Sequence, residues 1–267
     1  MTAWFAAYAA LGLCSGFFAG LLGIGGGAVM VPVLAMFFSA QGFEHEQVMH
    51  LALGSSMATI LFTSVASLRS HHRHQAVIWQ VVRTFTPGIL IGTLLGAALA
   101  RVIDTQVLAV VFTVFIVANA ANMMIASTPE PRRTLPRSFG LSIVGMLIGA
   151  FSSLVAIGGA ALSVPYMTWC NVRMQQAIGT AAALGFPIAL GGTIGYVMNG
   201  MQSHALPSGS LGYVYLPAVA CLIPCGMIVA PFGARLAHRL PVSLLKRIFA
   251  CVLILLAIKM LHSLIDP

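Results

Sequence analysis

The chain has 267 residues, of which 59% are hydrophobic and only 7% are charged, whereas a soluble domain carries about 25% charged residues. This composition excludes a water-soluble globular protein and predicts an integral membrane protein. The net charge of +8 comes from residues in short loops between apolar segments, so we interpret it as an orientation signal and expect no nucleic acid partner.

Eight apolar stretches follow one another along the chain, at about residues 4–40, 47–68, 77–100, 105–127, 138–167, 175–199, 211–234 and 243–264. Runs of this length are typical of transmembrane helices and exclude a β-barrel, whose strands alternate polar and apolar residues. A polar segment interrupts them at residues 128–137. We therefore predict a first transmembrane repeat at residues 1–127, a cytoplasmic linker at 128–137 and a second transmembrane repeat at 138–267.

The two halves share repeated motifs. The segment GLLGIGGGAVMVPVL, which begins at Gly20, aligns without gaps on SLVAIGGAALSVPYM, which begins at Ser153, with 7 identities in 15 positions. Later in each half, Pro87 and the following GTLLGAALAR match Pro224 and the following VAPFGARLAH. Internal duplication of this kind is a common way to build a transporter.

The positive charges predict that the two halves are inverted relative to each other. If every apolar stretch crossed once, the thirteen Lys and Arg residues would divide 7 to 6 between the two sides, which disagrees with the positive-inside rule. If the first stretch of each half returns to the side it came from, only Arg101 and Lys259 face outside. The predicted fold is therefore all-α, with two inverted repeats that each contain a glycine-broken helix and three transmembrane helices.

The length of the first stretch supports a broken helix. Residues 4–40 as one straight helix would measure about 55 Å, against a hydrocarbon core of about 30 Å. Two shorter arms joined at Gly23–Gly27 fit this thickness better. A re-entrant hairpin and two full crossings both remain open, because they give the same sidedness.

The glycine clusters predict an anion site. A helix can restart after Gly25, Gly26 and Gly27, and another can restart after Gly158 and Gly159. A restarting helix presents N–H groups and the positive end of its dipole, and glycine lets an anion approach the backbone. Two inverted copies would direct two such ends at one central site. The alternative is that these glycines only allow close helix packing.

Hydroxyl groups follow each glycine element. The stretches 54-GSSMAT-59 and 179-GTAAALGFP-187 are predicted to begin the next helix in each half. Their side chains could donate hydrogen bonds to sulfonate or carboxylate oxygens, although hydroxyls in membrane helices also bond to their own backbone or to a neighbouring helix. The candidates are Ser55, Ser56, Thr59 and Thr180.

Three longer polar side chains are further candidates for substrate binding. Gln47 and Gln176 occupy similar positions in the two halves, where interfacial capping is the alternative. Arg83 lies inside an apolar stretch, where it either attracts an anion or extends its charge to the interface. We expect no metal site and no cofactor.

The glycine motifs resemble those of the TauE/SafE sulfite exporter family. The resemblance rests on GLLGIGGG followed by Pro32, on the second, degenerate copy of this motif, and on HHRHQAVIW after the second apolar stretch. It covers essentially the whole chain. The resemblance implies a multi-pass transporter of the bacterial cytoplasmic membrane that moves sulfite, sulfonates such as sulfoacetate, or other small organic anions.

The function predicted from these features is export of a small anion, with no enzymatic activity. All five acidic residues lie in loops or at segment ends, so no buried carboxylate is expected to bind a coupling cation. An anion that leaves a negative interior gains about 2.3 kcal/mol per charge per 100 mV. Ion-coupled uptake is the alternative; an intramembrane enzyme is disfavoured because no HExxH or GxSxG pattern occurs. The expected partners are the anion and membrane lipid, and the oligomeric state, including a homodimer, is open.

Overall fold

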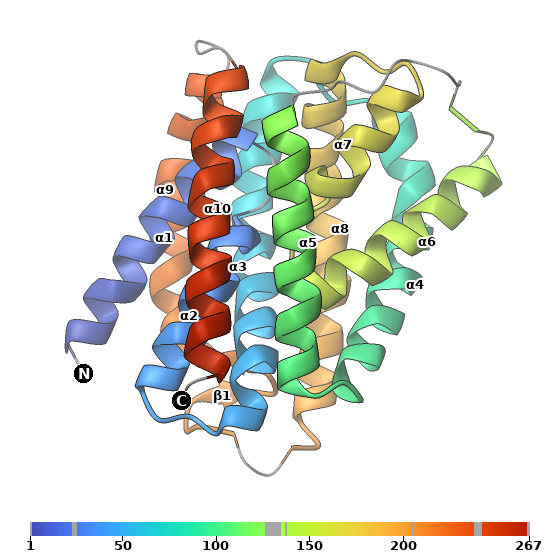
Figure 1. Cartoon of the computed structure of the whole chain (residues 1–267). Helices are drawn as coiled ribbons and strands as arrows, with labels where there is room; N and C mark the ends of the chain where they lie inside the picture. Colours follow the sequence, from blue (N-terminus) through green and yellow to red (C-terminus); the bar gives the residue numbers. More distant parts are fainter. Residues whose placement is uncertain are drawn as a thin grey trace.

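The computed structural model describes residues 2–22, 26–125, 135–136, 138–203, 206–237 and 242–265. Within these ranges the chain forms ten helices and one short antiparallel hairpin (Figure 1). The first half contains α1 (Thr2–Leu22), α2 (Gly27–Ala40), α3 (His45–Arg73), α4 (Trp79–Arg101) and α5 (Thr105–Ile125). The second half contains α6 (Ser138–Val155), α7 (Ala160–Trp169), α8 (Met174–Gly200), β1 (Ser210–Leu211), β2 (Val214–Tyr215), α9 (Leu216–Ala237) and α10 (Val242–Ile265). Gly25 and most of the predicted linker lie outside the described residues.

Seven of the described helices are long and apolar enough to cross a membrane, namely α1, α3, α4, α5, α6, α8 and α9. The 29 residues of α3 extend about 43 Å, which exceeds the hydrocarbon thickness of about 30 Å. The prediction of an all-α, multi-pass membrane protein is confirmed.

Each half begins with a broken pair of helices, as predicted. The first pair is α1 and α2, and the second is α6 and α7. With 14 and 10 residues, α2 and α7 are only about 21 and 15 Å long, so both are too short to cross a membrane. Figure 1 shows the start of α1 and the end of α2 on the lower side of the protein. The start of α6 and the end of α7 lie on the upper side. This arrangement favours the inverted relation of the halves, which stays a prediction.

The packing of the broken pairs supports the duplication. α1 packs along α9, and α6 packs along α4. A Cβ built on Gly16 would lie 2.5 Å from the Cα of Gly226, and one built on Gly149 would lie 3.0 Å from the Cα of Ile89. The repeat alignment pairs Gly16 with Gly149 and Gly226 with Ile89. The same positions therefore meet in both halves, where glycine allows the backbones to approach closely.

The helices α3 and α8 form the buried centre and run antiparallel. A Cβ on Gly185 would lie 3.5 Å from the Cβ of Ser64, and one on Gly192 would lie 3.0 Å from the Sδ of Met57. The stretches at 54–59 and 179–187 do not begin these helices as predicted, because α3 starts at residue 45 and α8 at residue 174. The first turns of α3 and α8 lie before the apolar runs and carry polar side chains. Such side chains are tolerated at the end of a membrane helix, because they can face water and headgroups there.

Candidate functional site

A glycine in the left-handed conformation closes the first helix break. Gly26 has φ 75° and ψ −9°, a conformation that costs residues with a side chain about 1–2 kcal/mol. Its carbonyl oxygen accepts hydrogen bonds from the N–H groups of Val29 (3.1 Å) and Met30 (3.0 Å). The N–H groups of Gly27 and Ala28 come before the first hydrogen bonds of α2, so they have no acceptor within that helix. Both residues are buried. This buried helix start carries the positive end of the helix dipole.

A residue other than glycine adopts the left-handed conformation at the second break. Ala156 has φ 43° and directly follows the last residue of α6. The N–H of Ile157 donates to the carbonyl oxygen of Ser152 at 3.2 Å, which is the hydrogen bond of a Schellman cap. Glycine usually occupies this position, so Ala156 stores backbone strain of about 1–2 kcal/mol.

The helix α7 restarts directly after Gly158 and Gly159, as the sequence predicted. The carbonyl oxygen of Gly159 accepts both the N–H (2.9 Å) and the hydroxyl (2.6 Å) of Ser163. A Cβ on Gly159 would lie 3.0 Å from the Cδ1 of Ile188 on α8. The second glycine motif is therefore packed against the central helix of its own half.

The two breaks touch each other at the centre of the protein. A Cβ on Gly27 would overlap the carbonyl oxygen of Ala156 and would lie 3.0 Å from the Cδ1 of Ile60 on α3. The close packing that the sequence left open as an alternative is thus present at Gly27. It is compatible with an anion site, because the same absence of a side chain exposes backbone donors.

Two buried hydroxyl groups lie within about one helical turn of this contact along α3 and α6. Ser56 and Ser153 are fully buried, and their Oγ atoms have no hydrogen-bond partner among the described residues. Ser56 lies one turn before Ile60 on the same face of α3, which faces the start of α2. Ser153 lies in the last turn of α6, three residues before Ala156. Unpaired buried hydroxyls are uncommon and costly, so they are candidates for ligand contacts.

The sequence predicted Ser56 as a candidate but missed Ser153. Ser153 lies next to Ser152 inside the apolar stretch 138–167, where its spacing is not informative, and it is paired with Gly20 in the repeat alignment. Only its place at the start of the repeated segment could have indicated a role. The contact between the two breaks makes Ser153 a candidate.

Ser55 and Thr180 already bind backbone groups. The N–H of Tyr215 donates to the Oγ of Ser55 at 2.9 Å, and the N–H of Ile78 donates to the Oγ1 of Thr180 at 3.0 Å. Ser55 follows Gly54 and Thr180 follows Gly179, and Ile78 and Tyr215 directly precede α4 and α9, so the two hydrogen bonds are equivalent. The hydroxyl of Ser55 thereby links α3 to the last residue of β2, and the hydroxyl of Thr180 links α8 to the residue before α4. Their role in substrate binding stays a prediction.

Of the remaining candidates, Thr59 directly precedes Ile60 on α3, whereas the other three lie away from the breaks. The hydroxyl of Thr59 donates to the carbonyl oxygen of Ser55 at 2.9 Å. Gln47 and Gln176 are each the third residue of their helix, about 20 Å along α3 or α8 from the breaks and at opposite ends of the antiparallel pair. Arg83 is exposed near the start of α4. Any contact of these three with substrate would therefore lie along its path, away from the centre.

Comparisons with known proteins agree with this architecture. The family described as sulfite exporter TauE/SafE matches residues 8–260. A "probable membrane transporter protein" of Haemophilus influenzae is 34% identical, over 94% of this chain and 95% of its own. The "probable membrane transporter protein YunE" of Bacillus subtilis is 23% identical, over 95% of this chain and 96% of its own. No solved structure matches the chain. With this match over nearly its whole length, the chain belongs to the TauE/SafE family of membrane transporters.

Proposed function

We propose that the protein exports a small oxyanion across the cytoplasmic membrane, with sulfite or an organosulfonate such as sulfoacetate as the substrate. The observation that carries this proposal is the contact between the start of α2 and the end of α6. Two buried hydroxyls without a described partner, those of Ser56 and Ser153, lie within about one turn of this contact along α3 and α6. The family description, sulfite exporter TauE/SafE, supports the same substrate class.

The groups at this contact suit an oxyanion. The N–H groups of Gly27 and Ala28 and the hydroxyls of Ser56 and Ser153 are all neutral donors, and an anion strengthens each hydrogen bond it accepts. The positive end of the α2 dipole adds to the attraction. Neutral donors bind an anion without the permanent charge that would hold it too tightly for release.

The carbonyl oxygen of Ala156 must move for the anion to bind next to Gly27. A carbonyl oxygen repels an anion, and this one lies against the start of α2. The left-handed conformation of Ala156 stores strain that a change of conformation would release. We therefore expect the end of α6 to shift relative to α2 during each transport cycle.

The distribution of acidic residues supports uncoupled export. The described carboxylates are Glu44, Glu46 and Asp104, which lie at or before the starts of α3 and α5. Within the described residues, no carboxylate lies deeper in a helix to bind a coupling cation. The membrane potential alone supplies about 2.3 kcal/mol per charge per 100 mV to an anion that leaves the cell.

Flux measurements in proteoliposomes test the proposal. The protein is reconstituted with sulfite, sulfoacetate, sulfate or acetate inside, and a potassium gradient with valinomycin sets a potential that is negative inside. We expect efflux of sulfite or sulfoacetate that rises with the potential and does not change when a proton or sodium gradient is added. Flux that requires such a gradient would favour ion-coupled uptake, and no flux of any of these anions would reject the proposal.

A further inference from the structure

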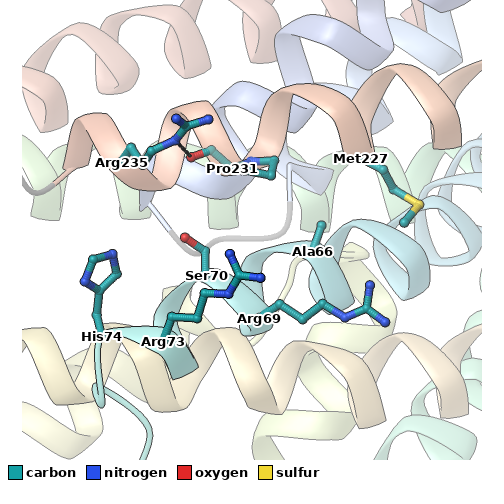
Figure 2. A pocket seen from close by; sticks show the side chains of 8 residues that line it. All are labelled: Ala66, Arg69, Ser70, Arg73, His74, Met227, Pro231 and Arg235. Carbon is teal, nitrogen blue, oxygen red and sulfur yellow. Dashed lines mark hydrogen bonds between the residues drawn. The ribbon is translucent and has the colours of Figure 1, made fainter.

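A basic pocket lies between the C-terminal ends of α3 and α9. Its volume is about 530 Å³. Figure 2 shows Arg69, Ser70 and Arg73 on α3 at one side of the pocket and Arg235 on α9 across from them. Ala66, Met227 and Pro231 form its apolar wall, and His74 also lines it. We refer to this site as the basic pocket.

No described carboxylate is close enough to neutralise these arginines. Glu46 lies in the first turn of α3, about 35 Å along the helix from Arg69. Glu44 precedes the same turn, and Asp104 lies three residues after the end of α4. Three arginines on the two walls of one cavity therefore create a positive potential near it, which favours an anionic ligand.

The side chain of Arg235 makes two contacts within α9. Its Nε donates to the carbonyl oxygen of Pro231 at 3.3 Å, and its guanidinium carbon lies 4.5 Å from the centre of the Phe232 ring. A cation above an aromatic ring is stabilised by the ring's negative face. The terminal guanidinium nitrogens remain available as donors, and a fixed donor loses less entropy when it binds.

The duplication shows that the fold does not require these charges. Counted without gaps from Gly54 and Gly179, Arg69 corresponds to Ile194 and Arg73 to Met198. In the aligned stretches after Pro87 and Pro224, Arg235 corresponds to Ala98. Ile194 and Met198 are exposed apolar residues, and they belong to the equivalent pair of helices, α4 and α8. The positions that correspond to these three arginines in the other half are thus apolar.

The surface next to the basic pocket, toward the middle of α3 and α9, is apolar. Phe62 lies on the same face of α3 as Ala66 and Arg69, and Ile228 lies on the same face of α9 as Arg235. Both Phe62 and Ile228 are exposed. Arginines at a helix end, above exposed apolar side chains, match a molecule with an anionic head and hydrocarbon chains.

We propose that the basic pocket binds a phosphate group, and that the headgroup of an anionic phospholipid in the cytoplasmic leaflet supplies it. The arginines bind the phosphate oxygens, and the acyl chains lie along Phe62 and Ile228. The basic pocket shares no residue with the contact between Gly27 and Ala156, so the proposal does not depend on which anion is transported.

Thermal unfolding of the purified protein in detergent tests this site. We expect phosphatidylglycerol to raise the midpoint of the wild type by several degrees, and phosphatidylcholine or inorganic phosphate to have little effect. The double variant Arg73→Gln/Arg235→Gln should lose most of the shift. Arg101→Gln, which changes an exposed arginine at the opposite end of the protein, should keep it.

Native mass spectrometry provides a second measurement on the wild type alone. We expect the protein to retain phosphatidylglycerol in preference to phosphatidylcholine. Equal retention of both lipids, or a full stabilising shift in the double variant, would overturn the proposal. Stabilisation by inorganic phosphate as strong as that by phosphatidylglycerol would overturn the assignment to a lipid headgroup.

Discussion

Ser55 and Ser56 are adjacent on α3 but have opposite environments. Both are fully buried. The hydroxyl of Ser55 accepts a hydrogen bond from the N–H of Tyr215, whereas the Oγ of Ser56 has no described partner. Removing one partner of a buried hydrogen bond costs about 1–3 kcal/mol, while removing an unpaired group costs little. The two serines can therefore separate an effect on stability from an effect on substrate binding.

We expect Ser56→Ala and Ser153→Ala to lower anion flux and to leave stability nearly unchanged. Each variant removes one hydrogen bond to an anion, worth about 1.5–3 kcal/mol, so flux at low substrate concentration should fall about 10- to 100-fold. Ser39→Ala is the control, since its hydroxyl is also buried and unpaired but lies about 18 Å from the break along α2. Normal flux in both variants would place the substrate site elsewhere.

We expect Ser55→Ala and Thr180→Val to lower the free energy of unfolding by about 1–3 kcal/mol each, because they leave the N–H of Tyr215 or Ile78 unpaired. The two hydrogen bonds are equivalent in the repeats, so the two losses should be similar. Thr180→Ser keeps the hydroxyl and should retain most of the stability. Chemical denaturation in detergent micelles measures all three. A loss below about 0.5 kcal/mol in both variants would show that these hydrogen bonds do not stabilise the fold.

At the scale of the helices, the contact between the two breaks restricts substitution strongly. A Cβ on Gly27 would overlap a backbone carbonyl of α6, which cannot move without shifting that helix end. Overpacking of this kind costs about 1–3 kcal/mol or more. Substitution of Gly26 is disfavoured for two reasons: its φ is positive, and a Cβ there would lie 2.6 Å from the carbonyl oxygen of Ser15. A substitution at either glycine therefore reports on packing as well as on anion binding.

We expect Gly27→Ala to lower the free energy of unfolding by about 3 kcal/mol. The control is Gly185→Ala on α8, where the new Cβ would meet only the Cβ of Ser64 at 3.5 Å and should be tolerated. The reverse change, Ala156→Gly, relieves a left-handed alanine and should raise the free energy of unfolding by about 0.5–1 kcal/mol. A Gly27→Ala variant as stable as the wild type would show that the two breaks do not touch.

The sequence predicted the elements better than the contacts between them. Glycine clusters before Pro32 and Pro165 located both breaks, because glycine and proline act on the backbone locally. The starts of α3 and α8 were placed too late, since their first turns are polar. The contact between Gly27 and Ala156 joins residues far apart in the chain, and no local pattern encodes it. The arginines of the basic pocket were interpreted only as orientation signals, because their grouping around one cavity depends on the packing of α3 against α9.

At the scale of the whole molecule, the orientation of the two halves follows from the starts of α1 and α6. The two helices are paired in the repeat alignment, and Figure 1 shows their outer ends on opposite sides of the protein. The basic ends of α3 and α9 lie on the side where α6 starts. The positive-inside rule places that side in the cytoplasm. An inverted duplication therefore predicts that α1 starts outside the cell and α6 starts inside.

Labelling of single cysteines in intact cells tests this orientation. On a background without the five native cysteines, we expect Ala3→Cys, at the exposed start of α1, to react with an impermeant thiol reagent. Ser208→Cys, exposed in the segment between α8 and β1, should also react. Ser138→Cys at the exposed start of α6 should react only after the membrane is permeabilised, because the α6 end carries the positive charge that stays inside. Labelling of Ala3→Cys and Ser138→Cys from the same side would mean that the two halves are parallel, and the two helix starts could then not approach one site from opposite sides of the membrane.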